Sequence, residues 1–442
     1  MTNEQVGKCP RALKRRGGIV VALAVGLATT GVHPALAQPA PEAEPSPAPL
    51  AGFVRVTQTD DGNSLRLEVA SKRYTRKGER GPDLRMTGAV HIGDPSFYAD
   101  IQTLMDTQDV VLFESVKPSG LGQETGDESD EQRAKTTERR IRLLALAIER
   151  RRAATDEIPA DLGAVEQGFD DRFGRIIAGA RADGWGNPIE MERAGAGFDL
   201  LSLGADAAPG GEGVNADLRF SSQKPLSATE KGEGGPGIQK QLAESLGLVF
   251  QPEAMNEGGP NWRNSDMSVD QVQERLEAAG AGGDQLFRML SGESFGAKLA
   301  GFILRLATGN ERSRAMMKVM MIEMLGAADE LLASGMGGMA GGERLMKVLI
   351  DDRNEVVIKD LEAIIRNEPK VQTVGILYGA GHLADLEKRI GAMGYELAEE
   401  TWFPAITVDF AASGLTPDEA AAMRNMMRMA IERQRPKPAK GN

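Results

Sequence analysis

The chain has 442 residues, enough for one large domain or two of ordinary size. A hydrophobic fraction of 41% and a charged fraction of 26% are typical of a globular protein that buries a core. The formal net charge is −12. Non-specific nucleic-acid binding needs Lys and Arg to neutralise phosphates, so we expect no nucleic-acid partner.

The N-terminus has the layout of a secretory signal peptide. Basic residues between Lys8 and Arg16 precede an uncharged, mostly apolar run at 17–32, and Ala35-Leu36-Ala37 then offers small residues for cleavage. The apolar run is short for a membrane-spanning helix of about 20 residues, so cleavage after Ala37 is favoured over an uncleaved anchor. No later segment is apolar for long enough to span a bilayer. We expect an exported protein, periplasmic or secreted.

The only cysteine, Cys9, lies in this predicted signal peptide (1–37). The mature chain would therefore have no disulfide and no cysteine-based metal site. An exported enzyme of this kind has a hydroxyl, a carboxylate, a histidine or a metal-bound water as its reactive group.

The hydrophobic pattern predicts an α/β fold: a mostly parallel sheet core with an N-terminal β-hairpin and a large helical insertion, or cap. The core is expected in two parts, because strand-type patterns stop near residue 117 and return near 343. The predicted segments are a flexible Pro/Ala-rich leader at 38–50, a first core part at 51–117, the insertion at 118–342, a second core part with a C-terminal helix at 343–435, and a tail at 436–442.

Within the first core part, alternating stretches on either side of Asp-Asp-Gly predict the hairpin, and a strand, a helix and a buried strand follow. The last three predict a βαβ unit, which implies parallel strands. The expected elements are strands at 52–58, 64–71, 84–92 and 109–116 and a helix at 95–105.

Long charged helical patterns fill the insertion, and no strong strand stands out there. The second core part alternates helices with strands again. The expected elements are helices at 130–152, 268–289, 296–332, 343–367 and 383–393, strands at 371–378 and 402–410, and a last helix that begins at Thr416.

Both histidines after the signal peptide occupy the fourth position of a Gly-x-x-His motif. His91 ends the motif that begins at Gly88, and His382 ends the one that begins at Gly379. Each motif follows a strand and precedes a helix, and Glu114 lies at the same end of a neighbouring strand. Sites in parallel sheets form beyond the carboxyl ends of the strands, so these side chains could converge. Glycine lets the backbone turn sharply and approach a ligand.

The residue types suit a catalytic metal. A histidine near a helix N-terminus stays neutral, as a metal ligand or a general base must be. Two imidazoles and one carboxylate commonly hold Zn, Mn, Co or Fe with open positions for water. The alternatives are that the two histidines are satisfied structural residues and that Glu114 caps or pairs at the surface.

The stretches GAVHIGDPSFYADIQTLMDTQDVVLFESV and VGILYGAGHLADLEKRI resemble the TraB/PrgY/GumN/TIKI family. Its hallmark is two GxxH motifs framing a glutamate, here Gly88–His91, Glu114 and Gly379–His382. The resemblance implies a fold shared with erythromycin-esterase-like and haem-binding ChaN-like proteins. It also implies a divalent metal, Mn or Co by preference, in the TIKI proteases, whereas other relatives hydrolyse a lactone, bind haem or block a peptide pheromone. The chain departs from TIKI in its long cap and in having no C-terminal membrane segment.

The same family tends to carry Arg-Asn on the helix before the last GxxH strand, and Arg353-Asn354 match that position. Arg353 could hold a substrate carboxylate or an oxyanion, or it could pair at the surface with Asp351 or Glu355. Asp94 could orient an imidazole or serve as an extra ligand, but its position favours an N-cap of the following helix.

These observations predict an exported metal-dependent hydrolase of a peptide or a small ester or amide. His91 and His382 would bind the metal, and Glu114 would be the third ligand or the base that deprotonates metal-bound water. One alternative is a non-catalytic protein that binds or sequesters haem or a peptide. Another is a metal-free, esterase-like hydrolase with a histidine as general base. The sequence leaves the oligomeric state open.

Overall fold

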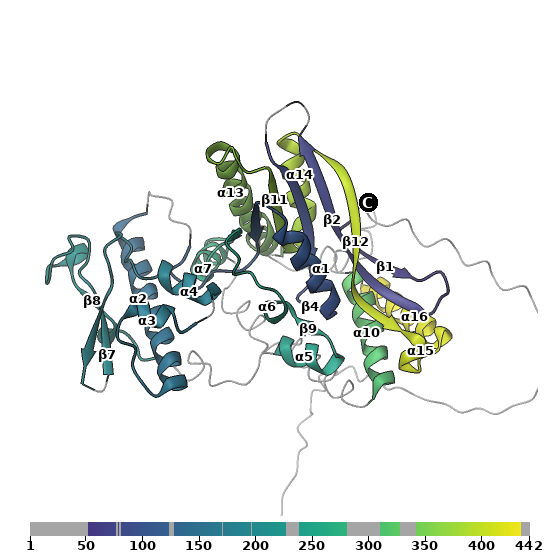
Figure 1. Cartoon of the computed structure of the whole chain (residues 1–442), viewed down its shortest axis with the longest axis horizontal. Coiled ribbons are helices and arrows are strands. Elements are labelled where there is room, and N and C mark those ends of the chain that lie inside the picture. Colours follow the sequence, from purple (N-terminus) through teal and green to yellow (C-terminus); the bar gives the residue numbers. More distant parts are fainter. Residues whose placement is uncertain are drawn as a thin grey trace, which may run out of the picture. The chain divides into compact units, whose positions relative to one another are not determined.

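The computed structural model describes residues 52–434, with gaps at 77, 79–80, 123–127, 170, 196, 227–237, 281–309 and 328–341 (Figure 1). The predicted signal peptide and leader lie outside the described residues, as do parts of the helices expected at 268–289 and 296–332. The described residues all belong to one compact unit.

The body of the protein is a seven-stranded mixed sheet with the order β1-β2-β3-β11-β5-β10, and β12 pairs with β2. Neighbours from β3 to β10 are parallel, whereas β2 runs antiparallel to β1, β3 and β12. The strands are β1 (Val54–Gln58), β2 (Ser64–Arg76), β3 (Asp83–Ala89), β5 (Val110–Phe113), β10 (Trp262–Asn264), β11 (Thr373–Gly379) and β12 (Tyr395–Asp409). The α/β class and the mainly parallel core are thus confirmed.

The predicted N-terminal hairpin is present as β1 and β2. Gln58 faces Leu65 across the turn. Gly62 has a φ of +72°, which glycine adopts without strain, and the amide of Asn63 donates to the Asp61 carboxylate at 3.0 Å. The Asp-Asp-Gly signal therefore specified this turn correctly.

Helices cover both faces of the parallel part of the sheet (Figure 1). On one face, α13 (Arg353–Asn367) and α14 (Ala380–Ala392) pack Leu361 and Leu386 against Leu84, Met86 and other strand residues. On the other face, α1 (Pro95–Asp106) buries its apolar stripe against β5 and β11. The strands β3 and β5 are parallel, as the βαβ pattern predicted, but β11 lies between them.

A separate structural unit follows β5. It consists of the long helix α2 (Asp130–Thr155), the short helices α3 (Leu162–Glu166) and α4 (Asp171–Gly179), and a three-stranded antiparallel sheet. The strands are β6 (Glu190–Ala194), β7 (Gly197–Ser202) and β8 (Leu218–Arg219), with short 3-10 turns η1 (Gly213–Asn215) and η2 (Phe220–Ser222) beside β8. Ile141, Leu144 and Ile148 of α2 pack with Leu200 in a core of its own.

This sheet was not predicted from the sequence. The strand β6 reads Glu-Met-Glu-Arg-Ala and its three charged residues are exposed, and β8 has only two residues. Such short, polar strands give too few apolar positions for the period-two pattern to show. We call residues 126–221 the helix–sheet module.

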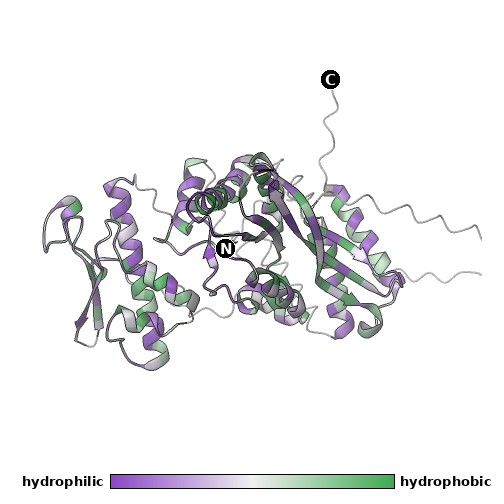
Figure 2. Cartoon of the chain, turned by 45° about the horizontal axis from the view of Figure 1, so that its top comes forward, coloured by the Kyte–Doolittle hydropathy of each residue, from purple (hydrophilic) through white to green (hydrophobic). Residues whose placement is uncertain are grey.

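The remaining described elements are mostly helices outside the seven-stranded sheet and the module. They are β4 (Ile92–Gly93), α5 (Ile238–Leu246), β9 (Val249–Phe250), α6 (Gln251–Ala254), α7 (Val269–Ala278), α10 (Glu311–Gly326), α12 (Gly342–Met346), the π-helical η3 (Lys347–Asp352), α15 (Phe410–Ser413) and α16 (Pro417–Gln434). Hydrophilic and hydrophobic residues alternate around the long helices (Figure 2). None of the described helices combines the length and apolarity that crossing a membrane requires.

Candidate functional site

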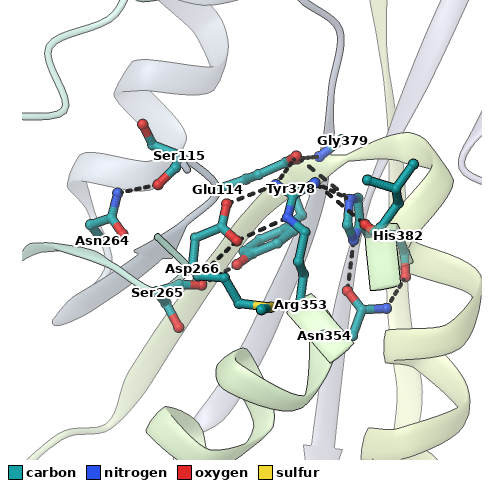
Figure 3. A network of polar contacts seen from close by, with 12 residues as sticks. Glu114, Ser115, Asn264, Ser265, Asp266, Arg353, Asn354, Tyr378, Gly379 and His382 are labelled. Atoms are coloured by element: carbon teal, nitrogen blue, oxygen red, sulfur yellow. Dashed lines mark hydrogen bonds and ion pairs between the residues drawn. The ribbon is translucent and has the colours of Figure 1, made fainter. Parts of the chain in front are cut away.

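Three neighbouring parallel strands, β11, β5 and β10, bring polar side chains to one edge of the sheet (Figure 3). Glu114 directly follows β5, Gly379 ends β11, and Asp266 lies two residues beyond β10. The carboxyl ends of parallel strands form the edge at which sites in α/β proteins gather. Sequence reasoning had placed Glu114 and the motif of Gly379 there, and the structure brings them together.

Arg353 joins these strand ends from the side of the helices. Its Nε donates to Asp266 Oδ1 at 2.9 Å, and its Nη2 donates to Asp266 Oδ2 at 2.7 Å and to Glu114 Oε1 at 2.6 Å. The fork-on-fork pairing with Asp266 is the strong, bidentate form of this interaction. The two surface partners considered from the sequence are not used, and one of them, Glu355, pairs instead with Lys359.

The π-helical turn η3 immediately precedes Arg353 and Asn354. Such turns insert an extra residue into a helix and re-aim the side chains that follow, often at functional sites. Both side chains are consequently directed inward, and Arg353 is 9% exposed while Asn354 is fully buried.

Both ring nitrogens of His382 are occupied. The Asn354 amide Nδ2 donates to the His382 carbonyl oxygen at 3.0 Å and to Asp385 Oδ2 at 2.9 Å, which fixes the orientation of the amide. Asn354 Oδ1 therefore accepts from His382 Nδ1 at 2.8 Å, so Nδ1 carries the proton. Nε2 is left with a lone pair, which faces Arg353 Nη1 at 3.3 Å.

The charges of this network follow from burial and from the central guanidinium. Burial lowers the pKa of His382 to about 4: Glu114 opposes this shift and Arg353 adds to it. Burial on its own would raise the pKa of Glu114, but the charge of Arg353 and the Gly379 N–H hold it below its ordinary value. Near neutral pH, the site thus contains a neutral imidazole, a cation and carboxylates.

The glycines of the two motifs have different roles. The Gly379 N–H donates to Glu114 Oε2 at 2.6 Å, and a Cβ on Gly379 would lie 2.9 Å from that oxygen. Gly379 is therefore needed for the close approach of Glu114. A Cβ on Gly88 would lie 2.4 Å from a methyl group of Val69, so Gly88 is required for packing of the sheet instead.

His91 and Asp94 lie apart from this network. His91 is exposed, and its backbone carbonyl accepts from Gln251 N at 2.9 Å, which links β4 to β9. Asp94 is at the N-cap position of α1, but its side chain does not cap the helix. Its Oδ2 accepts from Thr407 N at 2.7 Å, and its Oδ1 lies 3.6 Å from Lys318 Nζ. None of the network's hydrogen bonds or ion pairs within the described ranges involves His91.

A divalent cation does not fit the described residues of this site. The lone pair of His382 Nε2, which would bind a metal, points at a guanidinium, and a second positive charge there would be strongly repelled. Across the part of the chain that the structure describes, no three His, Cys, Asp or Glu side chains are grouped so that they could hold a metal ion. The predicted His91–Glu114–His382 ligand set is not assembled in this structure.

Two members of the network were missed by sequence reasoning. Asp266 is fully buried and provides the bidentate partner of Arg353. Tyr378 donates its hydroxyl hydrogen to the Ser265 carbonyl and meets the His382 ring edge to face, with ring centroids 5.3 Å apart. The signal for Asp266 was its place at the end of a strand, but β10 has only three residues and was not recognised.

Most polar groups of this network already have a hydrogen-bond partner, which limits the reactions that they could carry out. Arg353 already holds two carboxylates, and both nitrogens of His382 have partners. The Glu114 side chain, 16% exposed, is more accessible than that of Arg353 or Asp266. A hydrogen-bonded network of this kind fixes β5, β10, β11 and the start of α13 relative to one another.

Comparison with known proteins finds a match in the helix–sheet module and not around the Arg353 network. The family model of type II secretion system (T2SS) protein G matches residues 126–221, which form the helix–sheet module. No curated protein and no solved structure matches the chain. The match covers less than a quarter of the 442 residues, so it describes the module and not the whole protein.

This match corrects the family expectation. The chain's family-model match is to T2SS protein G and not to the TraB/PrgY/GumN/TIKI family, so the resemblance drawn from the two GxxH motifs was wrong. The functions that depended on it are withdrawn with it: the metal-dependent hydrolase, the haem- or peptide-binding protein and the metal-free hydrolase. The module is similar to a domain of a secretion system, and the protein is accordingly exported or associated with the cell envelope.

Proposed function

We propose that this chain is an exported protein that associates with a type II secretion assembly through its helix–sheet module. The observation that carries the proposal is the match of residues 126–221 to T2SS protein G. The matched residues coincide with one structural unit, in which α2 packs on β6, β7 and β8 around its own core. In this function the partner is a pseudopilin-type subunit, and the module provides the contact surface.

Several local interactions stabilise the module. Ser129 caps the N-terminus of α2 with a capping box, in which its hydroxyl accepts from Gln132 N and the Gln132 side chain accepts from Ser129 N. On the outer face of the sheet, Arg219 bridges Glu192 at 2.7 Å and Asp199 at 3.3 Å. Val214, in the connection between β7 and β8, is 40% exposed. These features leave a firm, accessible face on which another subunit can dock.

We further propose that the chain acts on the periplasmic side of the inner membrane or beyond it. The support is the N-terminal pattern of a basic stretch, an apolar run and Ala35-Leu36-Ala37. Detection of a mature chain that begins at Gln38 in the periplasmic or secreted fraction tests this location. Retention of the uncleaved chain in the cytoplasm would contradict it.

Single-cysteine crosslinking tests the association. The chain has one cysteine, Cys9, in the segment expected to be removed, so new cysteines are unique in the mature protein. Val214→Cys places a thiol on the module, and Leu397→Cys places one on β12 of the body, where the side chain is 52% exposed. We expect a purified pseudopilin subunit to be crosslinked from position 214 and not from 397. Equal yields from both positions, or none from 214, would refute the proposal.

A further inference from the structure

The segment that leads from the body to the module runs beside a segment of the body itself. The outgoing segment, 114–120, follows β5, and the segment at 265–270 leads from β10 into α7. Ser265 N donates to the Phe113 carbonyl at 3.1 Å and Lys117 N donates to the Met267 carbonyl at 2.9 Å. Val269 N donates back to the Lys117 carbonyl at 3.0 Å, so the parallel pairing of β5 and β10 continues beyond the sheet.

We call the contact between residues 114–120 and 265–270 the joint. Gly120 and Asp270 hold the end of the joint that lies at the module. Asp270 Oδ1 accepts from Gly120 N at 3.0 Å, and Asp270 Oδ2 accepts from Arg139 Nη1 of α2 at 2.7 Å. The buried Arg140 of α2 donates to the Gly120 carbonyl at 2.8 Å. Gly120 has a φ of +84°, and a Cβ there would lie 3.1 Å from atoms of both arginines. The helix α2 is thus bonded directly to Asp270.

The body end of the same segment is Asp266, four residues earlier. Its carboxylate is the bidentate partner of Arg353, which in turn contacts Glu114 and His382. Between the two aspartates, Ser268 forms a capping box with Gln271 at the start of α7, with both of its hydrogen bonds present. The capping box fixes Ser268 relative to Gln271, and the backbone of Met267 and Val269 is bonded to Lys117. The residues between the two aspartates are therefore held by hydrogen bonds on both sides.

We propose that residues 266–270 couple the helix–sheet module to the Arg353 network, so that a protein partner docked on the module changes the contacts of His382. The effect of a docked partner rests on the proposed function, whereas the coupling between the module and the network does not depend on any partner. Energetic coupling between two sites is carried by chains of packed side chains and by networks of hydrogen bonds and ion pairs. Here the ends are the Arg139–Asp270 pair and the Arg353–Asp266 pair.

Ring ¹⁵N signals of histidine provide the test. The full chain has three histidines, and the His382→Gln variant identifies the signals of His382. Asp270→Asn and Arg139→Gln each break the module end of the joint without touching the network. Arg219→Gln is the matched control, because it removes an ion pair on the outer face of the same module. We expect the His382 signals to shift in the first two variants and to stay in place in the control.

The outcomes separate the two proposals. Unchanged His382 signals in both joint variants, or an equal shift in the Arg219→Gln control, would overturn the coupling. Arg139 is 38% exposed, so Arg139→Gln decides the matter if Asp270→Asn does not fold. A second result would also overturn the coupling. In it, the pseudopilin subunit is crosslinked from Val214→Cys, but its addition to the wild-type chain leaves the His382 signals unchanged. Shifts in the joint variants without any crosslinking would refute only the proposed function.

Discussion

Acid should weaken the fold through His382, and the magnitude follows from its surroundings. The pKa of this histidine falls from 6.5 to about 4 because the ring is buried beside Arg353. An unfolded chain therefore takes up the proton near pH 6.5, whereas the folded chain takes it up only near pH 4. Between these values unfolding is accompanied by proton uptake, so the stabilising contribution is complete above about pH 6.5 and is lost as the pH falls to 4. At about 1.4 kcal/mol per pH unit, the loss is about 3 kcal/mol.

The measurement is guanidinium unfolding at pH values from 7 to 4, followed by tryptophan fluorescence. His382→Gln keeps a side-chain donor for Asn354 Oδ1 but has no proton to gain, so its stability should fall by about 3 kcal/mol less than that of the wild type over this range. His91→Gln is the matched control, since it changes a histidine outside the network and should keep the His382 contribution. Parallel pH profiles for the wild type and His382→Gln would refute the reasoning, as would an NMR titration of His382 with a midpoint near 6.5.

Three further substitutions test the network, the module and the joint by unfolding measurements. Arg353→Met leaves two carboxylates without their buried cation and should lower the free energy of unfolding by about 3–5 kcal/mol. The control Arg263→Met, at a surface pair with Glu368, should lower it by less than about 1 kcal/mol. Equal losses in the two variants would contradict the network. Leu144→Ala should cost about 2–5 kcal/mol because it opens a cavity in the module core, with hydrogen exchange faster in α2 than in the body. Gly120→Ala should cost about 1–3 kcal/mol, because alanine at this positive φ is strained, and a neutral effect would exclude the tight joint.

Sequence patterns predicted the body of the fold well, because its signals are local. The hairpin is encoded by alternation on either side of a tight turn, and the parallel strands are runs of apolar residues such as Val110–Phe113. The same logic placed Glu114 and His382 at the carboxyl ends of neighbouring strands, and the two side chains meet there. Arg353, by contrast, was a candidate only through the family resemblance. Position along strands and helices is a short-range property, and a single sequence carries it.

The partners within the site could not be predicted, because they depend on long-range geometry. Arg353 had two acidic neighbours on its own helix, yet its carboxylates come from positions 114 and 266. Its inward direction depends on the π-helical turn before it, and no composition signal marks that turn. His91 shares a four-residue motif with His382 but lies exposed beside Gln251. Identical local motifs thus ended in different environments.

The chemical role of a histidine is set by what its two nitrogens meet, and this decided the outcome at His382. With Asn354 on Nδ1, the ring presents its lone pair at Nε2, which is the arrangement found in many metal ligands. Two groups lie beside that nitrogen: Glu114 Oε1 at 3.5 Å and Arg353 Nη1 at 3.3 Å. The guanidinium of Arg353 already neutralises the Glu114 and Asp266 carboxylates, as a metal ion would otherwise do. A motif that fixes only the histidine therefore cannot distinguish a metal site from a salt-bridged network, because the deciding charge arrives from another helix.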